Sequence, residues 1–272
     1  MNAIFRYPGS KWSLAEWIIS HFPDNYEKMV YVEPFIGSGA VFFNKNPGAV
    51  ETINDLDSDI VNLFYVLREY PEELIRVLSL TPYSREEYDK SFEPCEDPVE
   101  KARRYMVKTT QAIGAKLGGS KCGWRNHKQS KVGGTACKWG NITTNVWAAA
   151  ERLKGDTTHL VQIEHKDALD LIERYNNHET LMYLDPPYMR SSRKSSRLYQ
   201  YEMSEDEHNR MLDIILESKA KIILSGYESP LYSERLKDWR CFHTQSQTTS
   251  AEMVDEFIWL NYEPPNEQIT LF

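Results

Sequence analysis

The chain has 272 residues, of which 41% are hydrophobic and 26% are charged, a composition typical of a folded globular protein. No apolar stretch approaches the roughly 18 residues that a membrane helix needs, and the first residues lack the apolar core of a signal peptide, so we expect a cytoplasmic protein without membrane contact. The formal net charge of -8 by itself argues against a nucleic-acid partner, although the charges are unevenly distributed.

A strand, a glycine-containing loop and a helix are predicted in succession near the N-terminus, over Met29–Glu33, Pro34–Gly39 and Ala40–Phe43. Gly37 and Gly39 allow a sharp turn and a close approach of the backbone to a ligand, as a nucleoside cofactor at the end of a parallel strand requires. The loop has neither the dinucleotide glycine pattern nor a Walker motif, so pyrophosphate and triphosphate ligands are disfavoured.

The next strand is predicted over Val50–Asn54 and ends at Asp55. An acid at the end of the second strand of such a unit is placed to bind ribose hydroxyls. The alternative is a cap on the helix predicted over Ser58–Tyr70, for which Asp57 and Ser58 are better positioned.

Residues 71–153 break this alternation and are interpreted as an inserted, mainly helical target-recognition domain, which leaves 1–70 and 154–272 as the catalytic domain. Helices are predicted over Glu72–Leu80 and Val99–Ala112, and a glycine-rich basic loop follows them.

Residues 101–150 contain no Asp or Glu, in a chain that has 40 of them. Together with the aromatic residues Tyr105, Trp124 and Trp139, this charge segregation predicts a patch that faces a polyanion; a merely solvated basic face is the alternative. The positive residues of the segment are Lys101, Arg103, Arg104, Lys108, Lys116, Lys121, Arg125, Lys128, Lys131 and Lys138. The DNA-binding candidates among them are Lys116, Lys121, Arg125, Lys128 and Lys131, and Arg125 is the candidate for reading a base edge.

The four cysteines form no Cys-x-x-Cys pair, so free thiols are expected. Cys122, His127 and Cys137 offer three metal ligands at irregular spacing, whereas structural zinc sites usually take four ligands in tighter pairs. We therefore expect no metal.

Strands and helices alternate again after residue 154, which predicts an α/β fold with a mainly parallel sheet. Asp167 stands between a strand and a helix, where it is either a ligand of the cofactor's adenine amine or the helix N-cap. The elements predicted here are strands His159–Glu164, Leu181–Leu184, Ala220–Leu224, Cys241–Thr244 and Glu256–Asn261, and helices Ala168–Tyr175, Glu205–Ser218 and Leu231–Leu236.

One buried strand ends in Asp185, Pro186, Pro187 and Tyr188. The prolines stop the strand, so the carboxylate and the backbone carbonyls are held at its carboxyl end, beside an aromatic ring. A carboxylate and a carbonyl can accept both hydrogens of an exocyclic amine, and the ring can stack on a base that has left its helix. The alternative is an ordinary acidic turn after a core strand.

A loop is predicted directly after this turn, over residues 189–197. Its positive charges include Arg190, Arg193 and Lys194, and it has no acid. It is either a lid that closes over DNA phosphates or a solvent loop.

Four motifs follow one another along the chain: Arg6-Tyr7-Pro8-Gly9-Ser10-Lys11, Glu33-Pro34-Phe35-Ile36-Gly37-Ser38-Gly39, Asn54-Asp55-Leu56-Asp57-Ser58-Asp59 and Asp185-Pro186-Pro187-Tyr188. In this order they resemble the Dam-type (D12 class, alpha group) S-adenosylmethionine-dependent DNA adenine-N6 methyltransferases. Ser10 departs from the family pattern, because a second glycine is usual there. A fifth segment, 254–262, is similar to the closing strand of the family.

The resemblance implies a Rossmann-like methyltransferase sheet with helices on both faces, S-adenosylmethionine as cofactor and double-stranded DNA as substrate, with a cognate restriction endonuclease as a possible companion. It implies catalysis by residues 185–188, by direct transfer of a methyl group to N6 of an extruded adenine. The cofactor-binding candidates are Tyr7, Lys11, Glu33, Pro34, Phe35, Gly37, Ser38, Gly39, Asp55, Asp167 and Asp185.

Two other functions stay open from the sequence. An RNA base methyltransferase shares the Asp-Pro-Pro-Tyr chemistry, and a non-catalytic DNA-binding module shares the basic insertion. A glutamine-N5 protein methyltransferase usually has Asn-Pro-Pro-Tyr, so Asp185 weighs against it.

Overall fold

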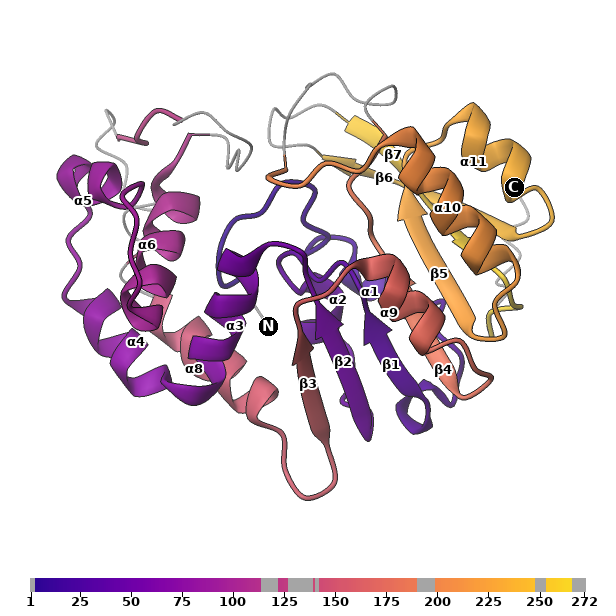
Figure 1. Cartoon of the computed structure of the whole chain (residues 1–272), viewed down its shortest axis with the longest axis horizontal. Helices are drawn as coiled ribbons and strands as arrows, with labels where there is room; N and C mark the ends of the chain where they lie inside the picture. The colour runs from indigo at the N-terminus through magenta and orange to yellow at the C-terminus, as the bar shows by residue number, and fades with distance from the viewer. Residues whose placement is uncertain are drawn as a thin grey trace.

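The computed structural model describes residues 3–113, 122–126, 139, 142–189, 199–247 and 253–265. Within these residues a seven-stranded sheet has the strand order β3-β2-β1-β4-β5-β7-β6 (Figure 1). Strands β1 to β5 are parallel, whereas β7 lies antiparallel between β5 and β6. The strands are β1 (Val30–Glu33), β2 (Val50–Asn54), β3 (Leu160–Glu164), β4 (Thr180–Leu184), β5 (Lys221–Gly226), β6 (Arg240–Gln247) and β7 (Met253–Leu260). The predicted mainly parallel α/β sheet is confirmed.

Helices cover both faces of the sheet, as predicted. One face carries α9 (Ala168–Arg174), α10 (Glu205–Leu216) and α11 (Pro230–Arg235), in front of the strands in Figure 1. On β4, Met182 and Leu184 belong to the apolar cluster under these helices. Their neighbours Leu181 and Tyr183 belong to the cluster on the other face, because successive side chains of a strand point to opposite sides.

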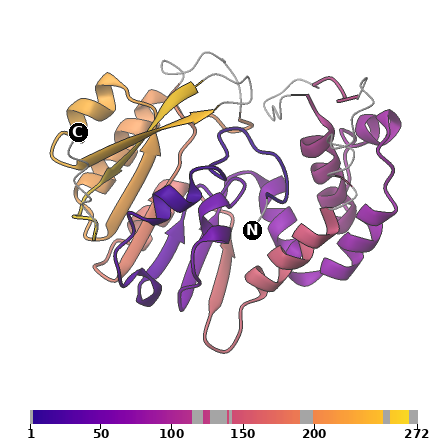
Figure 2. The same ribbon diagram turned by 180° about the vertical axis from the view of Figure 1, so that it is seen from behind.

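The opposite face carries α1 (Ala15–Ile19) and α2 (Ala40–Asn44), and a 3-10 turn, η1 (Tyr26–Lys28), precedes β1. In Figure 2, which shows the molecule from behind, this indigo N-terminal segment lies in front of the strands. The sheet therefore lies between two layers of helices.

The segment after β2 forms a helical bundle beside the edge strand β3 (Figure 1). Helix α3 (Ser58–Glu69) contacts both α6 (Pro98–Gln111) and α8 (Ile142–Lys154), and α4 (Pro71–Ser79) packs on α6 and α8. A shorter helix, α5 (Arg85–Lys90), packs on α6. Buried residues of this bundle and of the sheet belong to one apolar cluster, so the bundle is anchored to the sheet through α3 and α8.

Among the residues that the structure describes, three α-helices were not predicted from the sequence, namely α1, α5 and α8. For α8 the prediction of a basic loop is wrong: Ile142, Val146, Ala149 and Leu153 recur every three to four residues and are all buried. The glycine-rich, basic stretch that precedes α8 hid this periodicity in the sequence analysis. None of the helices in the described ranges is long and apolar enough to cross a membrane.

Candidate active site

A cavity opens at the carboxyl ends of β1, β2 and β4 and encloses about 1080 Å³ of space, its open mouth included. This is the end of a parallel sheet at which α/β proteins bind ligands. Its wall contains every cofactor-binding residue predicted from the sequence except Gly39. The predicted residues on the wall are Tyr7, Lys11, Glu33, Pro34, Phe35, Gly37, Ser38, Asp55, Asp167 and Asp185.

The glycine loop between β1 and α2 depends on left-handed backbone at two positions. Gly37 has φ +48°, and a Cβ atom there would lie 2.8 Å from the ring of Tyr7. Gly39, with φ +69°, precedes the first residue of α2, where a Cβ atom would lie 2.7 Å from the Phe43 ring. Gly37 thus lets the Tyr7 ring close over the loop, whereas Gly39 shapes the turn into the helix.

Two serines join this loop to the N-terminal motif. The Oγ atoms of Ser10 and Ser38 lie 2.8 Å apart, within hydrogen-bonding distance. Ser10 is the position at which the chain departs from the family pattern. The serine therefore gives the N-terminal loop a polar tie to the glycine loop that a glycine would lack.

Asp55 holds the glycine loop through its carboxylate, which accepts hydrogen bonds from the backbone N–H of Gly37 and of Asp57, both at 2.9 Å. Burial raises the pKa of Asp55 to about 7, although these N–H groups oppose the shift. Asp57 is the N-cap of α3 and accepts from the N–H of Asp59. The helix-cap alternative therefore applies to Asp57, as expected, and Asp55 lies at the cavity.

Asp167 is the N-cap of α9, which confirms one of the two alternatives considered for it. Its carboxylate accepts a hydrogen bond from the N–H of Leu169 at 2.8 Å and so caps α9. It also lies on the cavity wall.

Lys11 and Asp185 form a buried ion pair, with 3.1 Å between Nζ and Oδ1. The Lys11 ammonium also donates to the carbonyl of Gly9 at 2.7 Å and lies 3.9 Å from a carboxylate oxygen of Glu256 on β7. One cation therefore sits between two carboxylates, one from the Asp-Pro-Pro-Tyr turn and one from the antiparallel strand. The sequence analysis placed Glu256 in a predicted strand and in the family-like segment 254–262, but it did not name this acid as a site residue.

Burial and this cation act in opposite directions on the acids of the site. Burial raises the pKa of Asp185 and of Glu256, and Lys11 opposes both shifts. Burial lowers the pKa of Lys11, but the two carboxylates outweigh burial, so its pKa is raised and the ammonium stays charged. Glu33 lies nearby, accepts a hydrogen bond from Tyr31 and has a pKa that burial raises to about 8.

The Tyr188 ring is packed rather than open. Its exposed fraction is 5%, Lys11 Nζ lies 4.7 Å from the ring centroid, and the ring of Tyr227 meets it edge-on at 4.5 Å. Its hydroxyl donates to Glu256 at 2.8 Å. The flat stacking face expected from the sequence is therefore covered in this structure, and of the four turn residues Asp185 and Pro187 line the cavity.

One part of the cavity wall was missed by the sequence analysis, the segment that precedes and begins α10. Its residues on the wall are Tyr199, Gln200, Tyr201, Glu202, Met203, Glu207 and Arg210. The Tyr199 hydroxyl packs against Gly9, where a Cβ atom would lie 2.5 Å away. In the sequence, the two tyrosines at 199 and 201, next to a charged loop, were the signal that could have indicated this part of the wall.

Most of the predicted DNA-binding residues lie outside the described residues: Lys116, Lys121, Lys128, Lys131, Arg190, Arg193 and Lys194. The same holds for His127 and Cys137, the partners considered for Cys122. Arg125 is described: its backbone N–H donates to the carbonyl of Gln111 at 2.8 Å, and its Nε donates to the carbonyl of Ala112 at 3.3 Å. Its guanidinium also repels that of Arg6, whose pKa is lowered first by burial and then by this repulsion.

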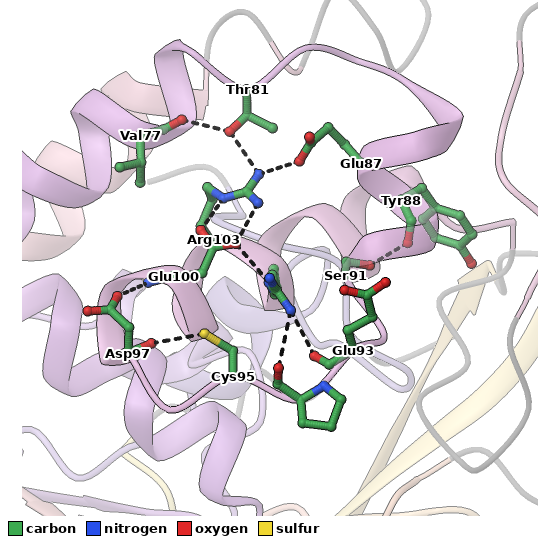
Figure 3. A network of polar contacts seen from close by, with 12 residues as sticks. Val77, Thr81, Glu87, Tyr88, Ser91, Glu93, Cys95, Asp97, Glu100 and Arg103 are labelled. Carbon is green, nitrogen blue, oxygen red and sulfur yellow. Dashed lines mark hydrogen bonds and ion pairs between the residues drawn. The ribbon is translucent and has the colours of Figure 1, made fainter.

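Four of the ten basic residues do not form an open patch, which corrects the sequence interpretation. Arg103 pairs with Glu87 and with Glu100, at 2.8 and 2.6 Å, within the network shown in Figure 3. Arg104 also pairs with Glu100. Lys101 and Lys108 lie 3.1 and 3.7 Å from the carboxylate of Asp59. The partner acids lie outside 101–150, so a segment without acids in the sequence is not without acids in space.

Comparisons with known proteins identify the family of the chain and several relatives. A family model described as D12 class N6 adenine-specific DNA methyltransferase matches residues 7–251. The type II methyltransferase M1.LlaDCHI of Lactococcus lactis subsp. cremoris is 25% identical over 279 aligned positions, which cover 94% of this chain and 94% of that protein. A DNA adenine methylase of Vibrio cholerae serotype O1 is 34% identical over 74 residues, 27% of this chain and 25% of that enzyme. A solved SAM-dependent methyltransferase from Agrobacterium tumefaciens aligns with a TM-score of 0.38 and 10% identity, over 93% of this chain and 60% of that one.

Proposed function

Because this chain belongs to the D12 class of N6 adenine-specific DNA methyltransferases, we propose that it methylates an adenine turned out of duplex DNA, at the turn formed by residues 185–188. The enzyme uses S-adenosylmethionine. The observation that supports this site is the position of the Asp185 carboxylate, on the wall of the cavity and paired with Lys11. The catalytic residues of the proposal are Asp185, Pro186, Pro187 and Tyr188.

The residues of the cavity fit the cofactor. The left-handed backbone at Gly37 allows close approach of a ligand, and Asp55, on the cavity wall, offers acceptor lone pairs to ribose hydroxyls. Tyr7 and Phe35 supply aromatic walls. When bound, S-adenosylmethionine supplies an electrophilic methyl group on its sulfonium.

Asp185 and the carbonyl of Pro186 are proposed to accept the two N–H hydrogens of the adenine amine. This pairing draws the nitrogen lone pair out of the ring plane and aims it at the methyl group, and such orientation supplies up to ~7 to 11 kcal/mol. The amine loses one proton as the new N–C bond forms. The Asp185 carboxylate, whose pKa burial raises, is placed to receive it.

Tyr188 replaces the stacking that the base loses on leaving the helix, worth about 1 to 3 kcal/mol. Only 5% of the surface of Tyr188 is exposed, so the surrounding side chains must move before a base can stack on its ring. The base therefore enters a site that is closed in part before it binds.

DNA is proposed to lie across residues 71–153 and the loop after the turn. The basic residues that would contact its phosphates are Lys116, Lys121, Lys128, Lys131, Arg190, Arg193 and Lys194, with Arg125 reading a base edge. Residues 1–70 and 154–272 would then form the catalytic domain. We further propose a cytoplasmic enzyme, and, on the likeness to a type II methyltransferase, a cognate restriction endonuclease in the same host.

The proposal is tested by incubating the purified chain with labelled S-adenosylmethionine and either duplex DNA or RNA of the same sequence. We expect N6-methyladenine in the DNA, none in the RNA, and no product with Asp185→Ala. Asp170→Ala, an exposed acid of α9, is the matched control and should retain full activity. Product in RNA alone would establish the RNA methyltransferase alternative, and the absence of product with the unaltered chain would favour the non-catalytic module.

A further inference from the structure

Glu256 is a buried acid with two partners in the proposed catalytic machinery. It lies in β7 with 7% of its surface exposed, and its Oε2 atom accepts the hydroxyl hydrogen of Tyr188 at 2.8 Å. The same oxygen lies 3.9 Å from Nζ of Lys11. Ser246, on the neighbouring strand β6, provides a further hydrogen bond to this carboxylate. The acid is thus fixed by the sheet itself and not by a loop.

We propose that Glu256 is a positioning residue for methyl transfer, which holds the Tyr188 ring by its hydroxyl and shares the Lys11 ammonium with Asp185. It acts through these two residues and does not line the cavity. The inference rests on the proposed functions of Asp185 and Tyr188. It assigns to the antiparallel strand of the sheet a direct part in organising the Asp-Pro-Pro-Tyr turn.

The first reason is the number of acceptors around one hydroxyl. The Tyr188 hydroxyl has a single hydrogen to donate, and it lies within hydrogen-bonding reach of Asp185 as well as Glu256. While Glu256 accepts that hydrogen, the acceptor positions of Asp185 stay available for the adenine amine. Without the Glu256 carboxylate, the hydroxyl turns to Asp185 and competes with the amine.

The second reason is the division of one cation between two carboxylates. Lys11 Nζ contacts Oδ1 of Asp185 at 3.1 Å and is also attracted by Glu256. When the charge of Glu256 is removed, the ammonium is bound by Asp185 alone and pairs with it more tightly. The Asp185 carboxylate then accepts more weakly from the substrate amine, and kcat falls while the cofactor cavity keeps its lining.

Glu256→Gln keeps the shape of the side chain and removes its charge. We expect it to lower kcat by about tenfold, because the amide oxygen still accepts from Tyr188, though more weakly than a carboxylate, and no longer shares the Lys11 ammonium, while calorimetry gives an S-adenosylmethionine Kd close to that of the unaltered enzyme. Asp255→Asn is the matched control, because it removes one acid from the exposed side of the same strand, and it should leave kcat unchanged.

A double-mutant cycle separates positioning from a merely structural contribution. Tyr188→Phe keeps the ring and removes the hydroxyl, so it should lower kcat on its own. If Glu256 acts through that hydroxyl, the Tyr188→Phe/Glu256→Gln enzyme should be no slower than the slower single variant, whereas independent residues give the product of the two losses.

Multiplicative losses in the cycle would overturn the route through the Tyr188 hydroxyl. A Glu256→Gln enzyme with the kcat of the unaltered chain, or loss of cofactor binding together with kcat, would overturn the inference as a whole. Asp185→Ala distinguishes this failure from failure of the proposed site. If Asp185→Ala is inactive while Glu256→Gln is fully active, only the positioning role is lost. If Asp185→Ala is itself active, the proposed catalytic site is wrong.

Discussion

The ammonium of Lys11 and the carboxylate of Asp185 form an ion pair with 3.1 Å between Nζ and Oδ1, inside a cavity wall where the lysine is 4% exposed. The pair joins the N-terminal motif to the Asp-Pro-Pro-Tyr turn. Because breaking a buried pair leaves an uncompensated charge, each partner sets the protonation of the other.

Lys11→Met should move the pH profile of methyl transfer toward higher pH. Burial raises the pKa of Asp185 and Lys11 opposes that rise, so removal of the lysine raises this pKa further. With a higher pKa, the Asp185 carboxylate takes up a proton at a higher pH when the solution is acidified. The acid limb of kcat/KM should therefore shift to higher pH. Lys28→Met, on an exposed lysine, should leave the limb in place, and an unmoved limb in Lys11→Met would contradict the assigned coupling.

Gly37→Ala should weaken S-adenosylmethionine binding. The left-handed backbone at φ +48° costs a residue with a Cβ atom roughly 1 to 2 kcal/mol, and the added carbon would meet the Tyr7 ring at 2.8 Å. Calorimetry should give a Kd at least about tenfold higher, since 1.4 kcal/mol is a factor of ten. Gly48→Ala is the control, because the nearest atoms to its added carbon lie at an ordinary 3.5 Å. Equal Kd values for the two variants would remove Gly37 from the cofactor site.

Asp55→Asn should lower cofactor affinity by about 10- to 100-fold, the range for loss of a hydrogen bond to a charged group. Since burial raises the pKa of Asp55 to about 7, the affinity of the unaltered enzyme should also fall as pH is lowered through 7, when the carboxyl takes up a proton and loses acceptor capacity. The variant should lack that step. Asp97→Asn, which preserves an N-cap on α6, is the control, and an unchanged affinity in Asp55→Asn would place the ribose elsewhere.

Glu51→Gln should destabilise the fold by about 3 to 5 kcal/mol, because Lys45 and Arg152 would keep their charges without the buried carboxylate between them. Burial raises the pKa of Glu51, but these cations outweigh burial and the net pKa is lowered. The carboxylate therefore stabilises the fold above its unfolded pKa of roughly 4.3, and that contribution is lost as pH falls through the lower folded value.

Urea unfolding at neutral and acid pH measures this effect. Glu164→Gln is the matched control, because its pair with the exposed Arg174 is worth at most about 1 kcal/mol. If Glu51→Gln lowers the free energy of unfolding at neutral pH no more than Glu164→Gln does, the ion pairs of Glu51 with Lys45 and Arg152 do not hold α8 to the sheet.

Replacing Lys116, Lys121, Lys128 and Lys131 by Gln should weaken DNA binding on all sequences and flatten its salt dependence by up to about 3 to 4 in slope, since each phosphate contact contributes roughly 0.9. Cofactor affinity should stay the same. As a control, Lys101→Gln/Lys108→Gln should change the slope little, because both lysines are paired with Asp59. An unaltered slope in the quadruple variant would mean that this segment does not face DNA.

Local signals in the sequence determined the elements and the chemistry of the turn. The strand ends at Asp55 and Asp185, the glycine loop and the N-cap at Asp57 all follow from apolar runs, proline and glycine geometry and capping, each of which acts within a few residues. The spacing of apolar residues also specified α8, but the glycine-rich basic stretch before it hid that signal.

Only the tertiary structure decided which distant side chains share the site. Strand β7 lies antiparallel beside β5, and this pairing brings Glu256 to Tyr188 and Lys11. Likewise, α6 packs on α5 and α3, and acids of those two helices pair with basic residues of α6 that lie in the acid-free segment 101–150. Charge pairing and burial depend on which elements become neighbours in space, and that choice is made by packing of the whole core, over distances along the chain at which local sequence patterns carry no information.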